Sequence, residues 1–165
     1  MKKVAIIMGS DSDLPVMRAC FAKLRELNVP FETRVLSAHR TPQQTAQYVS
    51  SAASNGIGVI IAAAGKAAHL AGAAAANTAL PVIGVPIKSS TLDGLDALLS
   101  TVQMPSGLPV ATVAIDGAAN AAILAAQILA LGCPDLSQRI LDMRQDMALS
   151  VLAKNERLEE RLHEE

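Results

Sequence analysis

Aromatic residues are scarce in this 165-residue chain, at 2%, with no tryptophan, one tyrosine and two phenylalanines. We therefore expect no platform on which nucleic-acid bases could stack. The net charge of -1 also excludes the broad basic surface of a nucleic-acid-binding protein. Because hydrophobic residues still make up 51% of the chain, the core must be built from Ala, Val, Ile and Leu.

Cysteines and long apolar runs are also few. Cys20 and Cys133 lack the spacing of a metal or redox motif, so we expect buried thiols in a reducing cytoplasm. The apolar run 4–8 is too short for a signal peptide and indicates a strand. Glycine, proline and polar residues interrupt the alanine-rich middle of the chain, which argues against a membrane-spanning helix.

Strand-like and helix-like segments alternate along the chain. The predicted strands are 4–8, 31–36, 59–64, 82–85 and 110–115, and the predicted helices include 14–27, 42–55, an alanine-rich one ending near 77, 92–102 and 120–131. Continuous apolar strands joined by helices are typical of parallel sheets covered on both faces. The pattern therefore predicts an α/β fold, a three-layer, flavodoxin-like doubly wound parallel sheet of about five strands.

The C-terminal part of the chain should extend this fold as a helical arm. Residues 120–131 are apolar nearly all round, so we expect them to be buried on several sides, partly in a subunit interface. A last helix begins near Asp135 and becomes strongly charged. With no repeat or linker to divide it, the chain is predicted to be a single domain over 1–165, in which 135–165 form the arm.

Polar residues concentrate in three loops that follow the first three predicted strands. The loops read GSDSD (9–13), SAHRTP (37–42) and GKAAHLAG (65–72). Ligands of doubly wound sheets bind beyond the carboxyl ends of the strands. We therefore expect all three loops to open on one side of the sheet and to share a site.

The first loop offers backbone N–H groups and hydroxyls at a helix N-terminus, which is a suitable place for an anion. Asp13 could accept hydrogen bonds from sugar hydroxyls, but Ser12 or Asp13 could equally do no more than cap the helix. The loop has neither the Gly-Lys-Ser/Thr of a phosphate-binding P-loop nor the spaced glycines of a dinucleotide site.

The second loop combines a guanidinium and an imidazole. Arg40 is a planar donor that suits a phosphate, and Ser37 can donate to the same anion. His39 can gain and lose a proton near neutral pH, although a solvent-facing histidine without a task is the alternative. Thr41 and Pro42 are expected to begin the following helix.

The third loop contains Gly65, Lys66 and His69. Gly65 would let a ligand approach the backbone, and His69 could be a site residue or could only orient the loop. Three scattered histidines do not make a zinc site, so no metal is expected. The residues themselves therefore predict a site for a small phosphorylated ligand, with a histidine that transfers a proton.

Six segments occur in an order that is familiar from one enzyme family: GSDSD, SAHRTP, AAHL, PVIGVP, LDGLDALLSTVQMPSGLPVATVAI and NAAILAAQIL. Over residues 3–131 the chain closely resembles the class I N5-carboxyaminoimidazole ribonucleotide (N5-CAIR) mutases of bacterial purine synthesis. Arg40 favours this class over the related animal-type carboxylases, which tend to carry SAHKT.

The resemblance implies an isomerase that moves the carboxylate of N5-CAIR to ring carbon C4 without a cofactor, with His39 as general acid and base. It implies that Ser10 and Asp13 contact the substrate, Asp13 at the ribose. It also implies that Ser12, Ser37 and Arg40 hold the phosphate and that Ala38, Gly65 and Ala67 line the base and carboxylate region. Family members are homo-octamers with sites at subunit boundaries, so a homo-octamer is expected here.

The third loop departs from the family pattern. Ala63, Lys66 and Ala71 replace a Gly, a Gly and a Pro. Lys66 places a cation beside the expected carboxylate pocket, where it could assist carboxylate binding. Alternatively it points to solvent or pairs with an acid of a neighbouring subunit.

Two other functions stay open at this stage. One is an aminoimidazole ribonucleotide (AIR) carboxylase that uses free CO2 in the same site. The other is a non-enzymatic, flavodoxin-like binding or signalling module. A flavin site would need aromatic residues, and a phospho-acceptor domain would need an Asp where the third strand ends in Ala64 and Gly65.

Overall fold

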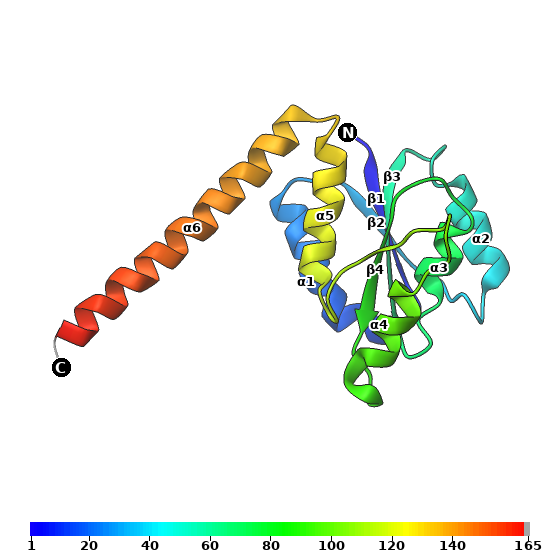
Figure 1. The fold of residues 1–165 in the computed structure, drawn as a ribbon. Coiled ribbons are helices and arrows are strands. Elements are labelled where there is room, and N and C mark those ends of the chain that lie inside the picture. The colour runs from blue at the N-terminus through cyan, green and yellow to red at the C-terminus, as the bar shows by residue number, and fades with distance from the viewer. Residues whose placement is uncertain (164–165) are drawn as a thin grey trace.

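The structure of the protein, a computed structural model, describes residues 1–163, so 164 and 165 of the predicted arm lie outside the described part. Five parallel strands form one sheet in the order β2-β1-β3-β4-β5 (Figure 1). They are β1 (Lys3–Met8), β2 (Phe31–Val35), β3 (Ile57–Gly65), β4 (Val82–Ile87) and β5 (Ala111–Thr112). This is the flavodoxin-like doubly wound order, which confirms the predicted fold class.

Helices cover both faces of the sheet (Figure 1). One face packs against α1 (Leu14–Glu26), α5 (Ala118–Ala130) and the first part of α6 (Pro134–His163). The other face packs against α2 (Pro42–Ser51), α3 (Leu70–Ala75) and α4 (Leu95–Val102). Two short 3-10 turns, η1 (Asp11–Asp13) and η2 (Leu92–Gly94), precede α1 and α4.

The central strands are apolar on both sides because each side meets a layer of helices. In β1, Val4 and Ile6 belong to the core beneath α1 and α5, whereas Ala5 and Ile7 belong to the core beneath α2 and α3. Side-chain direction alternates along a strand, so a strand covered twice needs a continuous apolar run. The small side chains of α5 let it lie close to the sheet and to α1; its buried residues are Ala118, Ala121, Ala122, Ala125 and Ala126.

Strand β4 is longer than predicted, because it continues through Pro86 to Ile87. The carbonyl of Pro86 accepts a hydrogen bond from the Asp116 backbone N–H. The carbonyl and the nitrogen of Pro86 therefore both point toward the segment that follows β5. The β4–β5 ladder has already ended at Gly84, and no strand there needs an N–H from Pro86. For β5 the prediction of 110–115 was wrong, since only Ala111 and Thr112 pair with β4.

Two predicted helices also differ from the structure. The segment 92–102 is not one helix, because the three residues of η2, Leu92, Asp93 and Gly94, have φ angles of 52°, 51° and 91°, and α4 begins only at Leu95. Three left-handed residues in succession cannot belong to a right-handed helix. Helix α2 ends at Ser51 rather than near 55, and turns lead from it to Gly56, whose φ is 79°.

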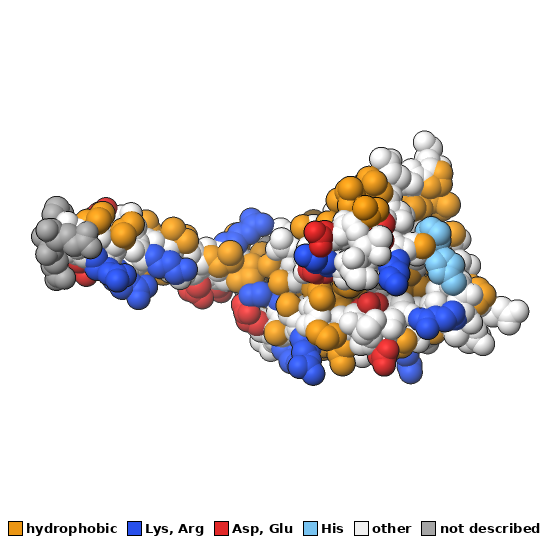
Figure 2. All heavy atoms as spheres, turned by 90° about the horizontal axis from the view of Figure 1, so that it is seen from below, with side chains coloured by type: hydrophobic (Ala, Val, Ile, Leu, Met, Phe, Trp, Pro, Cys, Tyr) orange, Lys and Arg blue, Asp and Glu red, His pale blue; other side chains and the backbone are white. Residues whose placement is uncertain are grey.

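Helix α6 covers most of the segment for which an arm is expected, and it extends away from the sheet (Figure 1). Only its first turns are anchored: Leu136, Ile140 and Met143 are buried, and the Arg139 side chain donates to the Leu27 carbonyl over 2.9 Å. Beyond this point the described side chains are exposed, and Figure 2 shows apolar groups along the arm. Within residues 1–163, no helix combines the length and apolar character needed to cross a membrane.

Candidate functional site

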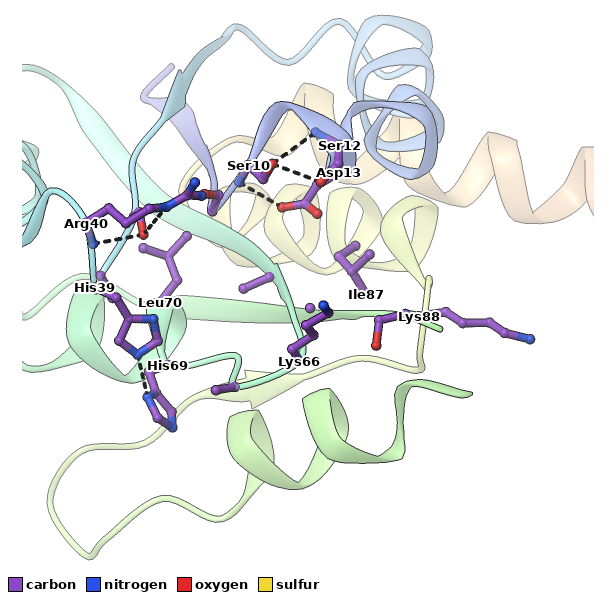
Figure 3. Close-up of a pocket in the computed structure, with 17 residues that line it drawn as sticks. Ser10, Ser12, Asp13, His39, Arg40, Lys66, His69, Leu70, Ile87 and Lys88 are labelled. Atoms are coloured by element: carbon purple, nitrogen blue, oxygen red, sulfur yellow. Dashed lines mark hydrogen bonds between the residues drawn. The ribbon is translucent and has the colours of Figure 1, made fainter. Parts of the chain in front are cut away.

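A pocket of about 610 Å³ opens at the carboxyl edge of the sheet (Figure 3). Its walls come from the segments that follow β1, β2, β3 and β4. The chain leaves β1 for β2 at one edge and then crosses back to β3, so this pocket lies at the point where the winding reverses. All candidate residues named from the sequence line it.

The loop after β1 is held by a reciprocal capping box. The Ser10 side chain accepts from the Ser12 backbone N–H over 3.2 Å, and the Asp13 carboxylate accepts from the Ser10 backbone N–H over 3.1 Å. Ser10 therefore caps the 3-10 turn η1, whereas Asp13 occupies the N-cap position of α1 without a side-chain hydrogen bond to that helix, and Ser12 caps neither. Burial raises the pKa of the Asp13 carboxyl above its usual value, and the Ser10 hydrogen bond only partly opposes this.

The loop after β2 is tied to the loop after β1 through Arg40. Its Nη2 donates to the Gly9 carbonyl over 2.9 Å, and its backbone N–H donates to Ser37 Oγ over 3.2 Å. Thr41 occupies the N-cap position of α2, but its hydroxyl bonds the Ser37 backbone instead of the helix. The predicted helix start is right, whereas the predicted capping bond is absent, because Thr41 is used to close the Ser37–Thr41 turn.

His39 and His69 face each other at the surface of the pocket (Figure 3). His39 Nε2 lies 2.9 Å from His69 Nδ1, with the two rings inclined by 70°. One of these nitrogens must carry the shared proton and the other must accept it. The two loops that contain these residues are thus joined by an imidazole pair that can hold or move one proton.

The loop after β3 begins with Gly65 and Lys66. A Cβ on Gly65 would lie 3.2 Å from the Ile87 carbonyl, so glycine here relieves a close approach between β3 and β4. This gives Gly65 a packing reason in addition to its place in the pocket wall. Lys66 has a φ of 56° and an exposed side chain, and His69 stands at the N-cap of α3.

Sequence reasoning missed the contribution of β4. Ile87, Lys88 and Ser89 also line the pocket. The Lys88 backbone N–H donates to Asp116 Oδ1 over 2.8 Å, and Lys88 Nζ lies 3.1 Å from Asp93 Oδ1. Ligands of doubly wound sheets bind beyond the carboxyl ends of the strands, and this rule applies to the fourth strand as it does to the first three. The sequence could therefore have indicated that the residues after the fourth strand line the pocket.

The described residues do not assemble an evident metal site. Within 1–163, no three His, Cys, Asp or Glu side chains lie close enough to share an ion. Cys20 lies on the buried side of α1, where burial raises the pKa of its thiol to about 12, while Cys133 is half-buried. The pocket's chemistry therefore comes from two imidazoles, three basic side chains, one carboxylate and several hydroxyls.

Comparison with known proteins identifies relatives over nearly the whole chain. The family model described as AIR carboxylase matches residues 3–150. An N5-carboxyaminoimidazole ribonucleotide mutase from Pyrococcus horikoshii is 57% identical over 157 residues, covering 95% of this chain and 89% of that protein. The mutase from Thermotoga maritima is 53% identical over 160 residues, covering 97% and 94%.

Two further comparisons agree with these matches. A phosphoribosylaminoimidazole carboxylase from Ogataea methanolica is 61% identical over 132 residues, covering 80% of this chain but 24% of that longer protein. The crystal structure of PurE from Treponema denticola superposes with a TM-score of 0.86 at 26% identity, covering 94% of this chain and 97% of that one. On these matches, the chain belongs to the AIR carboxylase (PurE) family.

Proposed function

We propose that this chain is an N5-CAIR mutase, an isomerase of purine biosynthesis that converts N5-CAIR to 4-carboxy-5-aminoimidazole ribonucleotide (CAIR). One observation carries the proposal: His39, paired with His69 at 2.9 Å, lines the same pocket as the Arg40 guanidinium. A proton-transferring group and an anion-binding group thus serve one ligand. Relatives at 53% and 57% identity that carry the mutase name support this reaction.

The phosphate of the ribonucleotide is assigned to Arg40, Ser12 and Ser37. Arg40 Nη2 is held by the Gly9 carbonyl, so the guanidinium has a defined position before any ligand arrives. Preorganised donors bind an anion at a lower entropic cost than mobile ones. The Asp13 carboxylate accepts from Ser10 and lines the pocket, which suits it to accept a hydrogen bond from a ribose hydroxyl.

Proton movement through His39 makes the reaction balance. His39 gives a proton to the exocyclic nitrogen of the carbamate, the N–C bond breaks, and CO2 and the aminoimidazole ribonucleotide form. Ring carbon C4 then attacks CO2 to form a C–C bond, and the C4 proton returns to His39. The proton count of the enzyme is restored, and the steps consume neither ATP nor a redox partner.

His69 is assigned to hold His39 in the correct proton state. When both nitrogens of His39 carry protons, its Nε2–H donates to His69 Nδ1, and its Nδ1–H is the proton left for the substrate. After Nδ1 has given its proton, the Nε2–H bond persists and keeps Nδ1 as the basic nitrogen. The contact to His69 therefore selects the tautomer that the second half of the reaction needs.

The base and the moving carboxylate are assigned to the part of the pocket lined by Ala38, Gly65 and Ala67. The small residues at these positions leave room for a flat ring and for CO2 in the pocket that His39 also lines. A closed, apolar surrounding is needed to keep CO2 from escaping before C4 captures it.

The proposal also covers domain organisation, location in the cell and assembly. We take 1–165 as a single domain with 135–165 as its helical arm, working in the cytoplasm as a homo-octamer. The exposed apolar side chains of α6, among them Met147, Leu152 and Leu158, support assembly because a solvated helix has no reason to present them.

The decisive experiment is His39→Asn, assayed with N5-CAIR. Asn keeps a polar side chain of similar reach but cannot gain and lose a proton near neutral pH. Turnover is expected to fall at least about 100-fold while far-UV circular dichroism and melting temperature stay unchanged. Gln47→Asn, an exposed change on α2, serves as the matched control. Near-normal turnover by His39→Asn would remove His39 from the mechanism.

An AIR carboxylase that uses free CO2 is the second candidate, favoured by the carboxylase name of the fungal relative. Assays with N5-CAIR and with AIR plus bicarbonate, both without ATP, separate the two. Faster use of AIR and CO2 than of N5-CAIR would overturn the mutase assignment while leaving the site residues in place.

A further inference from the structure

Lys66 holds a backbone conformation that favours glycine. It directly follows Gly65, the last residue of β3, with a φ of 56°. No other non-glycine residue among those that line the pocket has a positive φ. Non-glycine residues with this backbone conformation cluster at active sites and ligand-binding loops. In Figure 3 the Lys66 side chain lies among the pocket residues, between His69 and Lys88.

The ammonium group of Lys66 is uncommitted, unlike the other cations of the pocket. Arg40 is bound to the Gly9 carbonyl, and Lys88 is paired with Asp93 at 3.1 Å. Within residues 1–163, Lys66 Nζ has neither an ion pair nor a hydrogen bond. The one carboxylate in the pocket wall, Asp13, already accepts from the Ser10 backbone.

These charges match a ligand with two separate anionic groups. Arg40, with the hydroxyls of Ser12 and Ser37, provides for one anion where α1 and α2 begin. Lys66, on the loop after β3, provides a second positive charge on the loop that also contains His69. A ligand with a single phosphate would leave this second cation without a function.

We infer that Lys66 binds the carboxylate that moves during the reaction and so selects carboxylated ligands over the bare aminoimidazole ribonucleotide. This inference rests on the proposed function, because it concerns the carboxylate of N5-CAIR and CAIR. The phosphate stays in one place through the reaction, whereas the carboxylate shifts from nitrogen to C4. A lysine ammonium on a flexible stem can follow such a shift, while the rigid planar guanidinium of Arg40 suits the stationary group.

The test compares two ligands that differ only in the carboxylate. Dissociation constants for CAIR and for AIR are measured by calorimetry with wild-type protein and with Lys66→Met, which keeps most of the side-chain length without the charge. CAIR affinity is expected to fall roughly 10- to 100-fold, as for loss of one charged hydrogen bond, with AIR affinity changed less than about twofold. KM for N5-CAIR should rise accordingly, and Lys66→Arg should restore part of the loss.

Two further variants keep the test decisive. Lys66→Gly relieves the positive φ, so it should raise the melting temperature while still weakening CAIR binding. Lys2→Met removes a cation that precedes β1, at the opposite edge of the sheet from the pocket, and should leave both affinities unchanged.

The outcomes separate the two proposals. Unchanged CAIR affinity in Lys66→Met, or equal weakening of CAIR and AIR, would overturn the role of Lys66 while wild-type turnover of N5-CAIR still supports the mutase. Absence of wild-type turnover overturns the mutase assignment, and a Lys66-dependent preference for CAIR over AIR would then still assign this lysine to a carboxylate.

Discussion

His39 Nε2 and His69 Nδ1 lie 2.9 Å apart, although 30 positions separate the two residues in the chain. The contact joins the loop after β2 to the start of α3 across the end of β1. It turns two isolated histidines into one hydrogen-bonded pair, in which one nitrogen donates and the other accepts.

Replacing His69 should lower kcat more than it raises KM. In His69→Phe a phenyl ring replaces the imidazole and Nδ1 is lost, so His39 no longer has an acceptor that holds its tautomer. We expect kcat for N5-CAIR to fall about 10- to 100-fold, with KM changed less than about threefold. Steady-state kinetics measures the split. A rise in KM with unchanged kcat would assign His69 to substrate binding alone.

Arg40→Lys should weaken binding even though it keeps the charge. The Arg40 guanidinium donates to the Gly9 carbonyl and has further N–H donors left for a phosphate. A lysine ammonium cannot reproduce this planar arrangement of donors. We expect KM for N5-CAIR to rise about 10-fold or more. Competition by inorganic phosphate should weaken in parallel, and equal phosphate inhibition of both proteins would contradict the assignment.

Asp13 should make stability depend on pH in an unusual direction. Its folded pKa is raised above the reference value of 3.8, so the folded state binds the proton more tightly than the unfolded state. Stability contributed by this group is present at acid pH and declines as pH rises through the window between the two pKa values. The melting temperature of Asp13→Asn minus that of wild type should therefore increase as pH rises from 4 to 7. A difference that shrinks over this range would contradict the burial effect.

Gly84→Ala should destabilise the fold. A Cβ at Gly84 in β4 would overlap Thr101 Cγ2 and come within 3.0 Å of Val110 Cγ1. Thr101 is buried and its hydroxyl donates to the Ala97 carbonyl, so it cannot turn away freely. We expect a loss of about 1–3 kcal/mol in the free energy of unfolding, measured with urea. Gly132→Ala, with nothing within 4 Å, is the control and should be near neutral.

The arm should govern assembly if the octamer proposal holds. Leu152→Glu places a charge on an exposed apolar position of α6, where the side chain is 59% exposed. We expect the particle to become smaller than an octamer in sedimentation analysis, with the sheet intact by circular dichroism. Gln145→Glu adds the same charge at a polar position of α6 as a control. An unchanged sedimentation coefficient for Leu152→Glu would exclude this face from the interface.

The fold class, and the part of the pocket that the loops after β1, β2 and β3 form, followed from local patterns. Continuous apolar runs indicate strands that are covered on both faces, and polar residues directly after them indicate the edge of the sheet where a ligand binds. Both signals can be seen in the sequence because each involves residues that are neighbours in the chain. Every candidate residue, from Ser10 to His69, was therefore correctly expected at the carboxyl edge of the sheet, where the pocket lies. Their chemical roles remain predictions.

Contacts between distant segments could not be derived in this way. The chain alone did not indicate that Arg40 bonds Gly9, that His39 meets His69, or that Lys88 joins the wall and pairs with Asp93. Each contact depends on strand order and register, which bring loop ends together through packing of the whole sheet. The passage of β4 through Pro86 has the same origin, since proline is tolerated only because β5 ends early.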